Sequence, residues 1–315
     1  MTQLTQLNGT QPNGTQPNET LATQSRPAYD DGSWLRQELY CAGCGRWLAE
    51  GEEESAGHRP IKLAPRLWVY TNYDCNLQCS YCLVSSSPFA ERRAMPLPRF
   101  RALLDEAALL GVRELFLTGG EPFLLPEIFE MLQLALPRFK TTVLTNAMVV
   151  RGKRLEALSA LGRDNLLLQV SLDDVSPGLH DAFRGAGSWD RTVEGIRLLQ
   201  ERGFTVRVAT TVTPELEPRI AEVRRFVEDE LRIPPQHHIV RPLLRRGFSE
   251  EGLLVGKETL MPELTVDNAG VYWHPAGTDD DLRVARDQGT LRVALEEVAR
   301  LLATRSGSKT LQPFR

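Results

Sequence analysis

Several features of membrane, secreted and nucleic-acid-binding proteins are missing from this sequence. No apolar stretch is long enough to cross a bilayer, and the first residues have neither the basic nor the apolar segment of a secretory signal. Basic residues do not outnumber acidic ones, and the formal net charge is -4. No general positive field therefore attracts nucleic acid or an anionic membrane surface. We expect a cytoplasmic protein that binds neither membrane nor nucleic acid.

Cysteine is also scarce, with 5 in 315 residues and none after Cys82. A reducing compartment disfavours disulfides, so these cysteines are expected to be metal ligands or buried thiols. The remaining composition is that of an ordinary globular protein, 42% hydrophobic and 25% charged. A chain of this length can bury a core of enzyme size.

Composition divides the chain into four predicted regions. The first residues are mostly Thr, Gln, Asn, Gly and Pro, and such a segment cannot bury enough apolar surface to offset the entropy of ordering it. The regions are a disordered tail (1–31), a small module containing Cys41 and Cys44 (32–62), a core (63–245) and a C-terminal extension (246–315).

Apolar strands alternate with amphipathic helices about six times through the core. The expected strands are Leu67–Tyr70, Leu115–Leu117, Thr141–Leu144, Leu166–Leu172, Val206–Val212 and His238–Val240. The expected helices begin at Pro98, Ile128, Leu155, Thr192 and Ile220. This alternation predicts an α/β fold with a parallel sheet and outer helices, and we expect a partial (βα)6 TIM-like barrel.

The alternation stops after Leu244. The runs 264–266 and 271–273 flank Asp267-Asn268-Ala269-Gly270, which predicts a β-hairpin. A helix is expected from Thr290 to Leu302. We expect the hairpin to cover the barrel.

Three cysteines, Cys75, Cys79 and Cys82, follow the first core strand at spacings of four and three residues. This spacing suits three corners of an iron–sulfur cubane and leaves its fourth iron open to a small molecule. Three buried thiols are one alternative, although the neighbouring residues are polar. A zinc site is the other, and it would need a fourth ligand from Cys41, Cys44 or a histidine.

With Tyr81 at its aromatic position, the signature Cys-x3-Cys-x-aromatic-Cys resembles that of the radical S-adenosylmethionine (SAM) superfamily. The resemblance runs from about Leu67 to Val240 and is nearest the branch with the molybdenum-cofactor cyclase and peptide-modifying enzymes. It implies that the three cysteines are catalytic residues holding a [4Fe–4S] cluster, whose open iron binds SAM. The reduced cluster then splits SAM into methionine and a 5′-deoxyadenosyl radical, which abstracts hydrogen from a substrate.

A second motif, Gly119-Gly120-Glu121-Pro122, follows the next strand. Two glycines let the backbone approach a ligand closely, and a carboxylate is a good acceptor for an ammonium group. The motif resembles the family's Gly-Gly-Glu-Pro element, which implies that it holds the amino group of SAM. An ordinary tight turn before a helix is the alternative.

Polar residues also end the third and fourth strands. The resemblance places Asn146 near SAM, and it implies that Ser171 and Asp173 reach the ribose hydroxyls or the carboxylate region. Ser171 and Asp173 share one side of a strand because side chains alternate with period two. Arg184 is expected to pair with the SAM carboxylate, or to be a solvated helix-end arginine. Arg241, after the sixth strand, would face the same end of the barrel and contact substrate.

Cys41-Ala-Gly-Cys44 resembles one knuckle of a zinc ribbon, with His58 as a third candidate ligand for zinc. The resemblance also implies an electron donor such as flavodoxin or ferredoxin, and it leaves the substrate open between a small metabolite and a peptide. A non-catalytic iron–sulfur or zinc protein that senses redox state or binds a partner is the alternative function.

Overall fold

The strands that the structure describes form two sheets. The computed structural model describes residues 38–41, 44–48, 52, 60–286 and 290–304. In the described part of the chain, one sheet has three strands in the order β2-β1-β3, and the other has nine in the order β12-β11-β10-β4-β5-β6-β7-β8-β9. The predicted tail, residues 1–31, lies outside the described residues, and the division into four regions stays a prediction.

Six consecutive parallel strands form the centre of the larger sheet. They are β4 (Arg66–Asn72), β5 (Glu114–Gly119), β6 (Lys140–Thr145), β7 (Leu166–Ser171), β8 (Thr205–Val212) and β9 (His238–Pro242). Strands adjacent in sequence are adjacent in the sheet, and every pair is parallel. Every residue of β4 is buried, as expected for a parallel strand covered on both faces.

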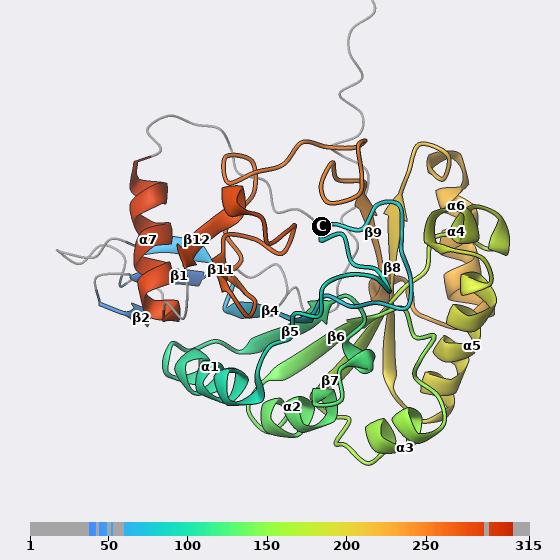
Figure 1. The fold of residues 1–315 in the computed structure, drawn as a ribbon, viewed down its shortest axis with the longest axis horizontal. Helices are drawn as coiled ribbons and strands as arrows, with labels where there is room; N and C mark the ends of the chain where they lie inside the picture. The colour runs from blue at the N-terminus through green and yellow to red at the C-terminus, as the bar shows by residue number, and fades with distance from the viewer. Residues whose placement is uncertain (1–37, 42–43, 49–51, 53–59, 287–289, 305–315) are drawn as a thin grey trace, which may run out of the picture.

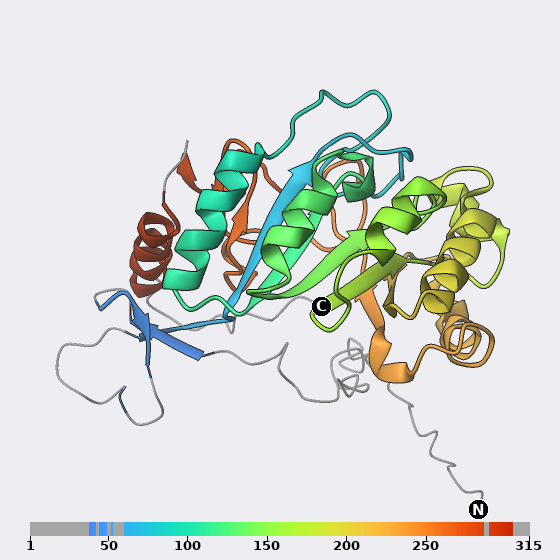
Figure 2. The same cartoon turned by 90° about the horizontal axis from the view of Figure 1, so that it is seen from below.

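Helices connect these strands along the outside of the curved sheet (Figures 1 and 2). They are α1 (Leu97–Leu109), α2 (Ile128–Ala135), α3 (Lys153–Ser159), α4 (Pro177–Arg184), α5 (Ser188–Glu201) and α6 (Ile220–Arg225). Short helical turns precede and follow some of them: 3-10 turns at Pro122–Leu124, Glu217–Arg219 and Pro235–His237, and a π turn at Phe226–Glu230 that continues α6. The predicted α/β fold, a partial (βα)6 TIM-like barrel, is confirmed.

The packing of α1 shows why these segments form helices on the sheet. Its buried residues are Phe100, Leu103, Leu104 and Ala107, spaced three and four apart along one helical face. Pro98 lies in the first turn, where its missing N–H breaks no helical hydrogen bond.

The C-terminal extension continues the sheet beyond β4. It contains β10 (Thr265–Val266), β11 (Gly270–Tyr272), a 3-10 turn (Asp280–Leu282), β12 (Arg283–Arg286) and α7 (Leu291–Ala303). The hairpin β10–β11 forms as predicted, and β10 also pairs in parallel with β4, with Thr265 beside Trp68. The hairpin strands therefore extend the sheet, while residues 274–276, just after β11, line the cavity described below.

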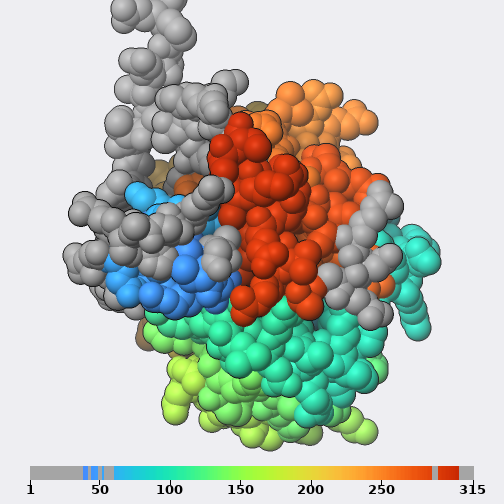
Figure 3. All heavy atoms as spheres, turned by 90° about the vertical axis from the view of Figure 1, so that its left-hand side faces the viewer, coloured from blue at the N-terminus to red at the C-terminus, as the bar shows by residue number. Residues whose placement is uncertain are grey.

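The small sheet packs beside α1 and α7. It is formed by β1 (Glu38–Cys41), β2 (Arg46–Trp47) and β3 (Pro60–Leu63). The Trp47 indole N–H donates to the Leu110 carbonyl at the end of α1, at 2.6 Å, and the Arg292 N–H of α7 donates to Glu106 at 3.2 Å. Figure 3 shows this face, with α7 and the small sheet side by side above α1.

Candidate functional site

The three motif cysteines lie on a loop between β4 and α1, at the carboxyl end of the parallel strands. Hydrogen bonds hold this loop to distant segments: the Ser80 N–H donates to the Phe183 carbonyl at 2.9 Å, and the Phe248 N–H donates to the Cys82 carbonyl at 3.0 Å. Cys75, Cys79 and Cys82 all line one cavity of about 230 Å³. Active sites of parallel α/β barrels lie at this end of the strands.

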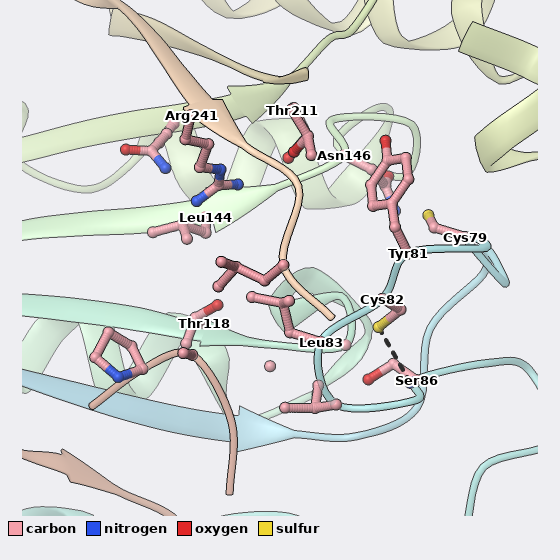
Figure 4. Close-up of a pocket in the computed structure, with 18 of the residues that line it drawn as sticks. Cys79, Tyr81, Cys82, Leu83, Ser86, Thr118, Leu144, Asn146, Thr211 and Arg241 are labelled. Carbon is pink, nitrogen blue, oxygen red and sulfur yellow. Dashed lines mark hydrogen bonds between the residues drawn. The ribbon is translucent and has the colours of Figure 1, made fainter. Parts of the chain in front are cut away.

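Two of the three sulfurs accept backbone hydrogen bonds. The Leu77 N–H donates to Cys75 Sγ at 3.4 Å, and the Ser86 N–H donates to Cys82 Sγ at 3.2 Å, the contact dashed in Figure 4. Burial raises the pKa of Cys75 to about 12, so this thiol keeps its proton at neutral pH unless a metal replaces it. Three thiols beside one cavity, two of them facing N–H donors, fit the ligand set of a [4Fe–4S] cluster with one open iron.

Gly119 and Gly120 pack directly against the start of the cysteine loop. A Cβ on Gly119 would lie 2.2 Å from the Asn72 carbonyl oxygen, and one on Gly120 would lie 2.1 Å from that of Asp74. Gly119 also has a φ of +144°, which favours glycine. Both glycines line the cavity. They therefore allow the end of β5 to contact the cysteine loop closely while leaving backbone exposed to the cavity.

The Glu121 side chain points into the protein and does not line the cavity. It is fully buried and accepts hydrogen bonds from Phe123 N–H (3.1 Å), Thr145 Oγ1 (2.8 Å) and Asn146 N–H (2.8 Å). Burial raises the pKa of Glu121 to about 7, against the effect of these three donors. Glu121 thus fixes the end of β6, and the direct contact with SAM implied by the resemblance stays a prediction.

Asn146 connects that strand end to the cysteine loop. Its amide Nδ2 donates to Asn76 Oδ1 at 2.9 Å, and Asn146 lines the cavity. The Thr192 hydroxyl of α5 donates to the Asn146 carbonyl at 3.1 Å. Strand β6, helix α5 and the cysteine loop therefore meet at this residue.

Asp173 is the centre of a buried polar network. Arg184 Nε donates to Asp173 Oδ2 at 2.5 Å, the Tyr81 hydroxyl donates to the same oxygen, and the Thr211 N–H donates to Oδ1 at 2.9 Å. Burial alone would raise the pKa of Asp173, but Arg184, together with His180 and Tyr81, outweighs it, and the pKa lies below its usual range. Tyr81, Ser171 and Arg184 line the cavity, whereas Asp173 lies behind them.

Inward-facing residues of the strands form the rest of the cavity. They include Trp68, Phe116, Gln169, Arg207 and Arg241, together with Glu263 and His274 from the extension. Figure 4 shows Thr118, Leu144, Thr211 and Arg241 on the strands, and Cys79, Tyr81 and Cys82 on the loop. The sequence motifs do not predict most of these strand residues; the signal that would find them is a polar or aromatic side chain at alternate positions of an otherwise apolar strand.

The sequence of this chain also matches a known protein family. The sequence matches the family model described as Radical SAM superfamily over residues 69–227, half of the chain. The chain belongs to the radical SAM superfamily. This confirms the resemblance based on the cysteine signature, and with it membership of a family of SAM-dependent iron–sulfur enzymes.

The relatives of this chain include a bacteriocin biosynthesis protein and a heme synthase. The chain is 35% identical over 157 residues to the antilisterial bacteriocin subtilosin biosynthesis protein AlbA of Bacillus subtilis, covering 49% of this chain and 35% of the relative. It is 34% identical to the AdoMet-dependent heme synthase of Methanosarcina barkeri, covering 48% and 43%. The matched region therefore spans less than half the length of these curated relatives.

A solved structure has the same fold. Native anSMEcpe with bound AdoMet and Cp18Cys peptide matches with a TM-score of 0.58 and 14% identity, covering 75% of this chain and 81% of that one. A likeness at this identity concerns the fold alone, and it agrees with the partial barrel.

No helix in the described residues is long and apolar enough to span a membrane.

Cys41 and Cys44 lie apart from the cavity. Their sulfur atoms are 3.0 Å apart, with Cys41 buried and Cys44 exposed. The third candidate ligand, His58, lies outside the described residues. Among the residues described, no group of three His, Cys, Asp or Glu side chains is placed to hold a single metal ion. Zinc at Cys41 and Cys44 stays a prediction.

Proposed function

We propose that Cys75, Cys79 and Cys82 bind a [4Fe–4S] cluster and that the cavity beside them binds SAM, which the protein cleaves reductively. One observation carries the proposal: the three thiols line the same cavity as Gly119, Gly120, Asn146, Ser171 and Arg184. These residues come from five separate segments of the chain, and each was expected at a SAM site on motif grounds. A reduced cluster would supply the electron that splits SAM into methionine and a 5′-deoxyadenosyl radical.

The protein residues would position SAM and keep it from solvent. The backbone of Gly119 and Gly120 faces the cavity without side chains, so it is available to the amino group of SAM. Arg184 is held by Asp173, which leaves its remaining guanidinium N–H groups as donors for the SAM carboxylate. Tyr81 is 8% exposed and lines the cavity together with Cys79, so its ring would help to shield a reactive species from water.

The substrate would be a peptide or a small molecule that loses a hydrogen atom. Both classes are represented among the relatives, by a bacteriocin biosynthesis protein and a heme synthase. The solved structure with bound AdoMet also holds a peptide. An electron donor such as flavodoxin or ferredoxin, and a cytoplasmic location, stay predictions from the sequence.

The test is reductive SAM cleavage by anaerobically reconstituted protein. With dithionite, the wild type should release 5′-deoxyadenosine, and SAM should change the electron paramagnetic resonance signal of the reduced cluster. Replacing Cys75, Cys79 and Cys82 together by Ala should abolish both the signal and the product. The matched control is the double variant Cys41→Ala/Cys44→Ala, which should retain both. A wild-type protein that holds a cluster but never cleaves SAM would instead support a redox sensor.

A further inference from the structure

The interior of this barrel carries charge where such barrels are usually apolar. Parallel α/β barrels fill their interior mainly with branched aliphatic side chains. Here the cavity-lining positions of β7, β8 and β9 include Gln169, Arg207 and Arg241. Arg207 is buried and Arg241 is partly buried. Removing a cation from water in this way is costly unless an anion compensates it.

Arg241 forms no ion pair with any of the described residues. Within that part of the chain, no carboxylate oxygen lies within 4.0 Å of its guanidinium, whereas Arg184 pairs with Asp173 at 2.5 Å. Burial lowers the pKa of Arg241, and the nearby positive charge of Arg184 lowers it further, against a smaller opposite effect of Asp173. An arginine nevertheless keeps its charge in proteins, so Arg241 brings to the cavity a positive charge that forms no ion pair among the described residues.

Arg207 adds a second positive group deeper in the barrel. It lies beside Gln169 in the register of β7 and β8 and donates to the Gln169 side-chain oxygen at 3.5 Å. Burial lowers its pKa to about 10, so it is charged at neutral pH. The carboxylate that lines this cavity, Glu263, accepts from the Trp68 indole at 2.8 Å and lies 3.8 Å from Arg66. The balance of charge facing the cavity is therefore positive.

The position of Arg241 separates it from the cysteine loop. Thr211 and Arg241 are paired in the register of β8 and β9, and Figure 4 places both on the strand side of the cavity, with Cys79 and Cys82 on the loop side. A ligand anchored at Arg241 would therefore lie across the cavity from the cysteines, the place that a substrate must take if SAM binds beside them.

We propose that Arg241, supported by Arg207, binds a carboxylate group of the substrate. The proposal rests on the function proposed above and narrows its substrate to a carboxylic acid, free or within a peptide. A guanidinium forms two parallel hydrogen bonds with a planar carboxylate, which fixes the position and the orientation of the substrate. Arg241 is thus assigned a specificity-determining role.

Binding of matched acids and amides tests this assignment. Calorimetry on anaerobic, reconstituted protein with SAM would compare glutarate with its diamide, and N-acetylglutamate methylamide with the glutamine analogue. The wild type should bind the acid of at least one pair about tenfold more tightly than the amide. A larger acid preference in the glutarate pair would indicate a free carboxylic acid as substrate, and a larger one in the N-acetylglutamate pair would indicate an acidic side chain of a peptide. Arg241→Gln should abolish the preference, and the exposed control Arg245→Gln should keep it.

Three results would overturn the assignment. The first is that the wild type binds acid and amide equally, or binds neither. The second is an acid preference that survives in Arg241→Gln, and the third is weakened binding of SAM itself in that variant. The last result would assign Arg241 to the carboxylate of SAM. Failure of the proposed function looks different, because wild-type protein would then release no 5′-deoxyadenosine whatever acids it binds.

Discussion

Arg184, the last residue of α4, donates to Asp173, just beyond the end of β7, at 2.5 Å in an almost fully buried salt bridge. The Tyr81 hydroxyl of the cysteine loop donates to the same carboxylate oxygen. One carboxylate thus joins the strand end, the following helix and the loop that carries the cysteines. Asp173 therefore orients residues that line the cavity without lining it itself, whereas Ser171 does line it; the contact of either residue with SAM stays a prediction.

Asp173→Asn should therefore destabilise the protein as well as impair the site. The change leaves the Arg184 cation buried without its anion, and breaking a buried pair this way costs about 3 to 5 kcal/mol. The free energy of unfolding, measured anaerobically by chemical denaturation, should fall by this amount, and 5′-deoxyadenosine release should fall with it. Asp164→Asn, at an exposed position, is the control. If both variants unfold like the wild type, the network does not have this role.

Gly120→Ala should prevent normal assembly of the cysteine loop. The added Cβ would lie 2.1 Å from the Asp74 carbonyl oxygen, and this backbone atom can yield only if the loop moves. We expect reconstituted Gly120→Ala to bind much less iron than the wild type, measured by iron analysis and visible absorbance. Gly162→Ala adds the same methyl group where nothing lies within 4 Å, and it should bind iron normally. Normal iron content in both variants would contradict the close contact.

The central fold and the position of the cysteine loop were predictable from local patterns. The apolar runs that became β4 to β9 are long enough to identify strands, and helices with regular apolar spacing lie between them. Arg184 is a candidate for a helix end, but the sequence does not define helix α4, which has eight residues and begins with Pro177-Gly178, a pair that indicates a turn. Its stability depends on tertiary contacts instead, with His180 and Arg184 buried.

Long-range pairing and side-chain direction were not predictable. The pairing of β10 with β4 joins Thr265 to Trp68, nearly two hundred residues apart, through a strand of only two residues. No local pattern specifies such a contact. The motif that contains Glu121 was recognised, but its sequence does not tell whether the carboxylate faces a ligand or caps the next turn. Asp173 and Arg184 were each identified, and their mutual pairing appeared only in the structure.

Stability should fall as the pH drops from about 6.5 towards 4, in part because of His238. Burial lowers the pKa of this histidine to about 4, and its Nε2 lies 2.8 Å from the Thr210 hydroxyl. The unfolded chain, with an ordinary histidine pKa near 6.5, binds a proton in this window that the folded protein does not. The loss attributable to His238 is on the order of 3 kcal/mol. Anaerobic denaturation at several pH values should show a smaller decline for His238→Gln than for the wild type. An identical decline would show that His238 does not titrate as described.

The fully loaded protein should contain about 4 iron atoms per chain, because its cysteines suffice for one cubane cluster. Cys75, Cys79 and Cys82 line the cavity, and only Cys41 and Cys44 remain. Two thiols are too few for a second cubane within one chain, and with His58 they would suit a zinc ion better.

Metal analysis of the wild type and of the double variant Cys41→Ala/Cys44→Ala checks this count. The variant should keep its iron and its SAM cleavage, and it should lose any zinc that the wild type carries. Neither cysteine lines the cavity, so the substitutions alter the small sheet and replace no cavity residue. If the wild type held about 8 irons per chain and the variant about 4, the protein would carry a second cluster, and the expected count would be wrong. Cys41 and Cys44 would then be ligands of an auxiliary cluster, whose remaining ligands would have to come from His58, a carboxylate or another subunit.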